Sequence, residues 1–187
     1  MIVAVLTDSD FIEALLVRLL TEEDRADVAI KAFGSSSVYS VARTVLASDR
    51  KPVAVVIDAN TPNPEGVAQQ RQGVEELVGD AAGGVPYKVV IAVPEIEALF
   101  FQRPEVLRRR FDGAVTDHLL ELAQYSARAA LRKLAADGNA ETLRWDILKT
   151  LTDEETAALH QTELIQEVLG FIGLVRRRAR PVATAGV

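Results

Sequence analysis

The sequence predicts an α/β fold, a mostly parallel sheet with helices on both faces, followed by a helical C-terminal extension. Three observations support this fold class. Short apolar runs alternate with helical patterns over the first hundred residues. The best runs contain no polar residue, which is typical of strands covered on both faces. After Pro94 the pattern changes to the helical period.

The elements of the α/β part follow in order. Residues 2–6 form the first strand, and the polar run Thr7–Asp10 leads into a helix, with Asp10 at the position of the N-cap. The remaining ranges are a strand at 28–33, a helix at 37–47, a strand at 53–57, a polar helix at about 65–78, a Gly-rich turn at 79–84 and a strand at 88–93 that Pro94 stops.

The rest of the chain is expected to be helical. The predicted helices cover residues 95–101, 104–110, 116 to about 136, 140–150 and 153 to about 175. Thr152 and Glu155 have the spacing of a capping box at the start of the last helix. We therefore divide the chain into an α/β core, residues 1–101, and a helical extension, residues 102–187, packed on or beside the core.

Composition excludes several kinds of chemistry. The 187 residues include no cysteine and two histidines, which excludes disulfides and thiolate sites and leaves little material for a zinc site. No apolar run is long enough to span a membrane, so we expect a cytoplasmic protein without membrane contact. The net charge of −6, concentrated in the first half, disfavours a stand-alone duplex binder. A nucleic-acid partner would need a metal ion or a second protein to offset the repulsion.

Acidic residues follow three of the predicted strands. They are Asp8 and Asp10, then Asp58, then Glu95 and Glu97. Because the carboxyl ends of parallel strands meet at one edge of a sheet, these residues are expected to be neighbours. Carboxylate oxygens suit Mg²⁺ or Mn²⁺, and such ions serve phosphoryl chemistry.

Each candidate has an expected role and a structural alternative. We expect Asp58 to be the principal metal ligand and Asn60 a weaker one, with ion or water contacts from Asp8 and Asp10 and a second ion or base position at Glu97. Asp10 could instead cap a helix, Asn60 could be a turn residue, and acids after Pro94 favour a helix start.

Two segments carry a resemblance to a known family. Val-Val-Ile-Asp58-Ala-Asn60 and Val-Pro94-Glu-Ile-Glu97-Ala-Leu-Phe-Phe resemble the small bacterial Toprim-like proteins, which are similar to the Toprim domains of the overcoming-lysogenisation-defect nucleases. The resemblance covers residues 1–101. It implies a divalent-metal-dependent protein that handles phosphodiesters, a nuclease or a nuclease component.

The sequence also departs from the family pattern. The family's first-strand glutamate falls on Leu6 or Thr7, and its Asp-x-Asp becomes Asp58-Ala-Asn60, whereas Asp10 and Glu97 agree with the pattern. Asp8 lies in the loop of the missing glutamate and could replace it. The resemblance therefore leaves open a working nuclease component or a catalytically impaired relative.

Two other function classes remain open. Paired acids after the first strand and Asp58 after the third also resemble a receiver domain with a phosphoacceptor aspartate, with residues 113–117 as a faint fifth strand. The second alternative is a non-catalytic interaction module. The partners expected across these interpretations are nucleic acid, an ATPase or nuclease subunit, or a second copy of the chain.

Overall fold

The computed structural model describes residues 3–179 and contains one four-stranded, all-parallel sheet. The strands are β1 (Val3–Thr7), β2 (Val28–Ala32), β3 (Val53–Asp58) and β4 (Tyr87–Ala92), in the order β2-β1-β3-β4. The central strands β1 and β3 are buried along their whole length, as their unbroken apolar runs predict. The predicted α/β class with a parallel sheet is confirmed.

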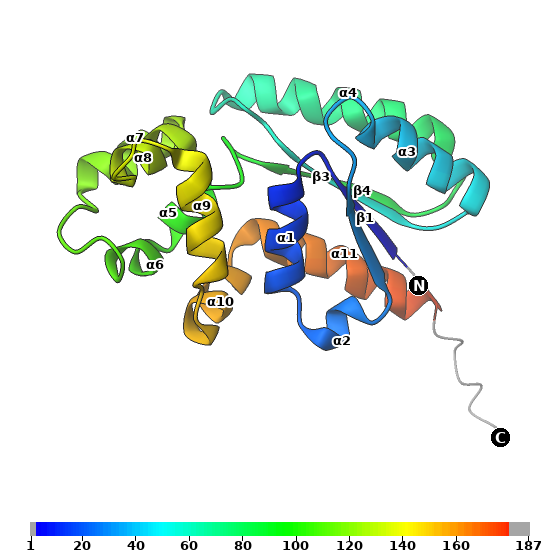
Figure 1. Cartoon of the computed structure of the whole chain (residues 1–187). Coiled ribbons are helices and arrows are strands. Elements are labelled where there is room, and N and C mark those ends of the chain that lie inside the picture. The colour runs from blue at the N-terminus through cyan, green and yellow to red at the C-terminus, as the bar shows by residue number, and fades with distance from the viewer. Residues whose placement is uncertain (1–2, 180–187) are drawn as a thin grey trace.

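Helices cover both faces of the sheet (Figure 1). One face is packed against α3 (Val38–Thr44), the π-helical turn η1 (Val45–Asp49) and α4 (Pro64–Ala82). The other face is packed against α1 (Asp10–Leu19) and α11 (Glu163–Ala179), while the short α2 (Glu22–Arg25) precedes β2. The last helix of the chain thus completes a layer that the first helix begins.

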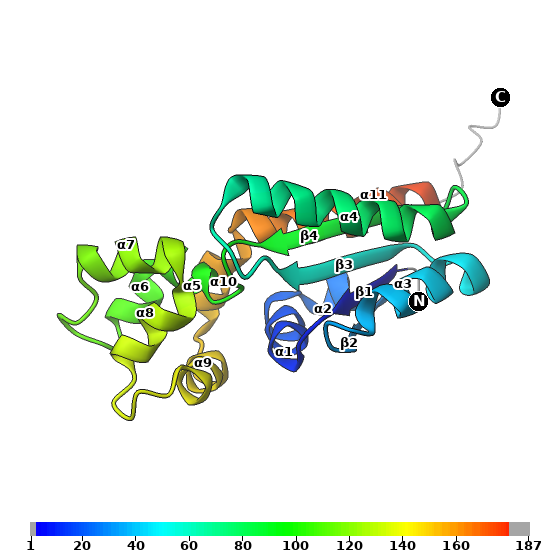
Figure 2. The same ribbon diagram turned by 90° about the horizontal axis from the view of Figure 1, so that it is seen from above.

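Six short helices form a helical lobe, residues 98–160, beside the sheet. They are α5 (Ala98–Gln102), α6 (Pro104–Arg108), α7 (Asp117–Tyr125), α8 (Ala127–Leu134), α9 (Ala140–Lys149) and α10 (Asp153–His160). In Figure 2 the arrowheads of β3 and β4 point toward this lobe, so the lobe stands at the carboxyl ends of these strands. This is the edge where ligands of open parallel sheets bind.

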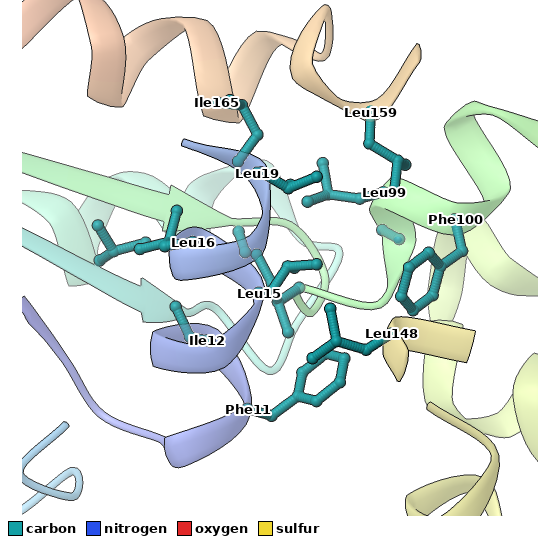
Figure 3. Close-up of a cluster of buried hydrophobic side chains, with 14 of the residues drawn as sticks. Phe11, Ile12, Leu15, Leu16, Leu19, Leu99, Phe100, Leu148, Leu159 and Ile165 are labelled. Carbon is teal, nitrogen blue, oxygen red and sulfur yellow. The ribbon is translucent and has the colours of Figure 1, made fainter. Parts of the chain in front are cut away.

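The lobe shares one hydrophobic core with the face of the sheet that α1 and α11 cover, while the opposite face has a separate core. Phe11 of α1 lies edge-to-face against Phe100 and Trp145 of the lobe, with ring centroids 6.4 Å and 5.2 Å away. Figure 3 shows the same helix directing Leu15 and Leu19 toward lobe residues. Because the apolar contacts are continuous, we treat the lobe as part of the same folding unit.

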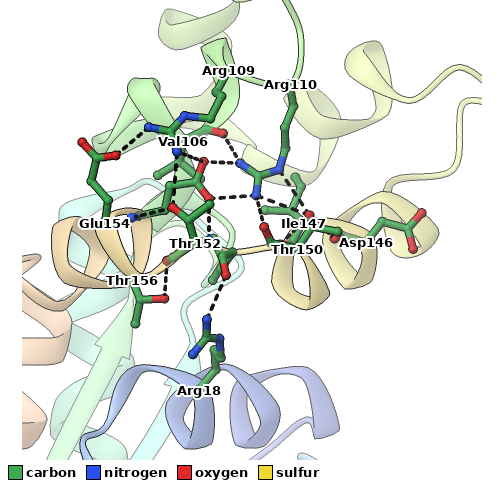
Figure 4. A network of polar contacts seen from close by, with 12 residues as sticks. Arg18, Val106, Arg109, Arg110, Asp146, Ile147, Thr150, Thr152, Glu154 and Thr156 are labelled. Atoms are coloured by element: carbon green, nitrogen blue, oxygen red, sulfur yellow. Dashed lines mark hydrogen bonds and ion pairs between the residues drawn. The ribbon is translucent and has the colours of Figure 1, made fainter.

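A polar network also joins the lobe to α1 (Figure 4). The Arg110 guanidinium donates to both carboxylate oxygens of the buried Glu155, at 2.5 Å and 2.8 Å, and to the Thr150 carbonyl at 2.8 Å. Arg18 of α1 donates to the Leu151 carbonyl at 2.8 Å. The network thereby fixes the turn between α9 and α10 from two sides.

Several predicted boundaries are wrong, each for a local reason. Ser9, not Asp10, caps α1, because its hydroxyl accepts from the Ile12 amide. The single helix predicted from 116 is interrupted at Ser126, which caps α8, and the one predicted from 153 ends at His160 before α11 begins. The capping box of Thr152 and Glu155 is confirmed.

Other differences concern β4 and its surroundings. The helix predicted to end near residue 78 continues to Ala82, and only Gly83 and Gly84 form the turn before β4. Residues 95–97 form a loop, and the helix begins at Ala98. In the described part of the chain, residues 113–117 add no fifth strand, and Thr116 instead caps α7.

None of the helices among residues 3–179 is long and apolar enough to cross a bilayer.

Candidate functional site

The loop after β4 folds over the end of β3. The pairing of β3 with β4 continues to Asp58 opposite Ala92, and the Asn60 amide then donates to the Pro94 carbonyl at 2.8 Å. This arrangement places the Ile96 amide 2.7 Å from Asp58 Oδ1. The chain segment 93–97 is therefore held directly beside the carboxylate that ends β3.

Two buried carboxylates share one arginine of the helical lobe. Arg128 of α8 forms an ion pair with Asp58 through Nη2 and donates from Nε to Glu97 Oε1 at 3.0 Å. Its backbone amide donates to Glu95 Oε2 at 2.9 Å. Ser126 is the C-cap of α7 and the N-cap of α8, and this break between the two helices brings Arg128 to the strand ends.

Glu97 is fully buried and has a second basic partner. Arg144 of α9 donates from Nη1 to Glu97 Oε1 at 2.5 Å. Both arginines therefore contact the same oxygen, and Glu97 Oε2 has no hydrogen-bond partner among the described residues. A buried carboxylate oxygen without a donor is costly, so this atom marks an incomplete polar site.

Asp8 adds a third carboxylate. It follows β1 directly, and its Oδ1 is also buried without a partner in the described part of the chain. Burial raises the pKa of Asp8, and the nearby Arg128 charge lowers it in part. The negative charge of Asp8 in turn makes a small contribution to the raised pKa of Asp58.

Asp58 is the most strongly perturbed of these acids. Burial, followed by the negative charge of Glu97, raises the pKa of Asp58 to about 7, although Arg128 and the Ile96 amide oppose the shift. When all three are ionised, the acids Asp8, Asp58 and Glu97 carry more negative charge than Arg128 and Arg144 carry positive charge. The cluster consequently favours an additional positive charge or a proton.

The predicted residues separate into two groups. The structure brings Asp8, Asp58 and Glu97 into one cluster. The Asp10 side chain is exposed on the first turn of α1 and makes no hydrogen bond or ion pair to any described residue, and Asn60 is exposed with φ of 55°. The side-chain amide of Asn60 donates only to the Asp58 backbone carbonyl, at 3.5 Å, so neither residue lines the cluster.

Sequence reasoning missed both arginines. Arg128 and Arg144 lie 70 and 47 residues after their carboxylate partners, Asp58 and Glu97, on helices whose local patterns carry no sign of buried charge. The one indication in the sequence is indirect. Asp58 ends a strand that is expected to be buried on both sides, and a buried acid needs a basic partner from elsewhere in the chain.

The raised pKa of Asp58 predicts a pH-dependent stability. Folded Asp58 keeps its proton up to about pH 7, whereas the unfolded chain loses it near 3.8. Between these values the folded state binds more protons, so the Asp58 contribution to the free energy of unfolding is complete at low pH and is lost as pH rises toward 7. Urea unfolding followed at about pH 5 and about pH 8 should show this loss.

Two matched variants isolate the contribution of the Asp58 carboxyl group to this pH dependence. Asp58→Asn should flatten the dependence relative to the natural chain, whereas Asp112→Asn, at an exposed position, should leave it unchanged. Equal pH dependence in all three proteins would contradict the assignment.

Comparison with known proteins adds no further constraint: no protein-family model, curated protein or solved structure matches the chain.

Proposed function

We propose that this protein binds a divalent cation, Mg²⁺ or Mn²⁺, at the carboxyl end of its parallel sheet and acts on phosphodiesters there, as a Toprim-like nuclease or nuclease component. The observation that carries the proposal is the cluster of Asp8, Asp58 and Glu97. Two of its members have a buried carboxylate oxygen without a partner among the described residues. Oxygen-rich, negatively charged sites of this kind match the ligands that hard cations prefer.

The carboxylate oxygens of Asp8, Asp58 and Glu97 are suitable ligands for a divalent cation, but their present arrangement does not form a metal site. Within residues 3–179, no group of three or more His, Cys, Asp or Glu side chains is arranged to hold a metal ion. Arg128 lies between Asp58 and Glu97 and contacts both. Cation binding by these residues would therefore require the Arg128 side chain to move away.

The roles proposed for the chain's own residues follow from their surroundings. Asp58 and Asp8 would hold the cation, and Glu97 would supply a second ligand or a base. A bound cation would polarise a phosphate oxygen or activate water. Asp10 and Asn60 are exposed and would contribute only contacts to solvent or substrate.

The competing interpretation is structural, since the same ion pairs attach the helical lobe to the sheet. A receiver-like phosphoacceptor has less support, because Asp58 is buried with both oxygens engaged and the described sheet has four strands. A non-catalytic interaction module remains compatible with the fold. Cation binding separates our proposal from these alternatives.

Titration calorimetry with Mn²⁺ and Mg²⁺ tests the proposal directly. We expect saturable binding by the natural chain, and at least about tenfold weaker binding by Asp58→Asn, because an amide carries no charge. Asp112→Asn is the control and should bind as the natural chain does. Absence of cation binding by the natural chain would overturn the proposal.

A second assay tests the reaction. Cleavage of a labelled oligonucleotide should require the cation, stop with EDTA and be lost in Asp58→Asn and Glu97→Gln. Cation binding without cleavage would support the catalytically impaired form of the proposal.

A further inference from the structure

Strand β4 is an edge of the sheet, because the described residues add no strand on its outer side. The carbonyls of Pro86 and Ala92 accept hydrogen bonds from amides of β3 and of the residue after it, so the even-numbered residues of β4 face β3. The N–H and C=O groups of Val89 and Ile91 therefore point away from the sheet. Arg71 of α4 donates to the Val89 carbonyl at 2.8 Å, whereas the Ile91 groups have no hydrogen-bond partner in the described part of the chain. This part of the edge is open to a further strand.

A groove runs along the open part of the edge. Its volume is about 210 Å³, and its lining includes Ile91 and Val93. In Figure 1 α4 lies above the sheet and α11 below it, and these helices line the groove from its two sides through Arg71 and Leu164. Val93 is 39% exposed and also lines a second hollow, beside Val67 of α4. A groove with unpaired backbone along it has the shape that takes one extended strand.

The α11 side of the groove is acidic. Glu163 and Glu167 lie one turn apart on α11, and Glu95 lines the groove from the loop after β4. Lys88 is 3.8 Å from Glu167, and the exposed Glu163 carboxylate forms no ion pair or hydrogen bond with any residue between 3 and 179. This negative charge would attract a Lys or Arg side chain and would repel a polyanion such as nucleic acid.

We propose that the open edge of β4 binds an extended segment of a partner protein in which Lys or Arg alternates with β-branched residues. The backbone of the segment pairs with the N–H and C=O groups of Ile91. Its side chains point alternately to the two faces of the sheet. The basic ones meet Glu163 and Glu167 on the α11 side, and the β-branched ones pack beside Val67 and Val93 on the α4 side. No residue of the carboxylate cluster lines the groove, so the proposal does not depend on the cation site.

A second copy of the chain fits this edge less well. Two β4 strands paired antiparallel about a twofold axis would place α4 beside α4 and α11 beside α11. The acidic residues of the two α11 helices would then face each other, and so would the two Arg71 side chains. Because like charges across an interface are unfavourable, the occupant that the charges favour is a basic segment of a different protein.

The first experiment measures peptide binding by fluorescence anisotropy. The probe is a labelled peptide in which the two residue types alternate, Lys-Val-Lys-Val-Lys-Val. We expect saturable binding by the natural chain. The acidic counterpart Glu-Val-Glu-Val-Glu-Val, and Lys-Lys-Lys-Val-Val-Val, which keeps the composition but loses the alternation, should each bind at least about tenfold more weakly.

A pair of valine variants tests the apolar side of the groove. Val93→Lys places a positive charge at the edge and should weaken binding of the alternating peptide about tenfold. Val17→Lys is the matched control, because Val17 has the same 39% exposure but lies on α1, outside the groove. It should bind the peptide with unchanged affinity.

A pair of double variants tests the acidic side. Glu163→Gln combined with Glu167→Gln removes two negative charges from the groove and should weaken peptide binding about tenfold. Glu22→Gln combined with Glu23→Gln removes the same charge from α2, where both residues are exposed, and should leave the affinity unchanged.

Hydrogen exchange of single amides, followed by NMR, identifies the atoms that pair. The Ile91 amide should exchange more slowly in the presence of the peptide, because it then donates to the added strand. This measurement uses the natural chain and does not depend on the folding of any variant.

Three results would each overturn the proposal. The first is an absence of peptide binding, or binding that leaves exchange of the Ile91 amide unchanged. The second is equal peptide affinity of Val93→Lys and Val17→Lys. The third is a natural chain that sediments as a dimer and that Val93→Lys converts to a monomer, since this would assign the edge to a second copy.

Discussion

Arg110→Ala should lower the free energy of unfolding by about 3–5 kcal/mol, because it leaves the buried Glu155 carboxylate without its principal partner. Arg110 also donates to the Val106 and Thr150 carbonyls, so the substitution opens the packing of α6 against the turn between α9 and α10. Burial alone would raise the pKa of Glu155, but the hydrogen bonds from Arg110 and the Thr152 amide outweigh it and the pKa is lowered.

The adjacent arginine provides the control. The Arg109 side chain is 51% exposed against 17% for Arg110, and its closest partner is the exposed Glu154. Arg109→Ala removes the same charge and should therefore cost only a small fraction of the stability. Urea unfolding of both variants measures the difference. Similar losses would show that net charge, and not the buried pair, sets the effect.

Phe100→Ala should destabilise the protein by about 3–5 kcal/mol, since Phe100 is fully buried between α1 and the helical lobe. The loss has two parts, the transfer of apolar surface to water and the cavity left beside Phe11. Because the core is continuous across the lobe and the sheet, we expect one cooperative transition at a lower urea concentration.

Phe33→Ala makes the same chemical change at a position where 38% of the residue is exposed. It should cost less than about 1 kcal/mol.

Two separate transitions in Phe100→Ala, with the sheet unfolding at its normal urea concentration, would contradict the core shared by the lobe and the sheet. Circular dichroism follows the secondary structure of the whole chain and Trp145 fluorescence follows the lobe, so two non-coincident curves would reveal a second transition.

The sheet could be predicted from the sequence because its signals are local. The apolar runs of β1 and β3 are unbroken up to Leu6 and Ile57, and Asp58 ends β3, so both the parallel sheet and the position of Asp58 follow from periodicity and topology. The expectation that the acids after β1, β3 and β4 would be neighbours needed only the rule that parallel strands share one carboxyl edge. That rule did not show that Asp10, one of these acids, would instead be exposed on α1.

What could not be predicted depends on distant parts of the chain. Nothing near Arg128 or Arg110 in the sequence indicates that each guanidinium pairs with a buried carboxylate more than forty residues away. Ser126 shows a subtler difficulty, because a serine within an amphipathic pattern is compatible with a continuous helix. Here its hydroxyl caps α8 instead, and the break determines where Arg128 lies.

The position of α11 has a consequence for synthesis on the ribosome. This helix is the last described element, yet Val168, Ile172 and Val175 belong to the same core as Val5 and Val90 of the sheet. Until α11 has left the exit tunnel, the face of β4 that this helix covers is bare, so the nascent polypeptide exposes apolar surface throughout the synthesis of the helical lobe. Chaperone capture is therefore the expected fate of a chain whose elongation stalls between β4 and α11.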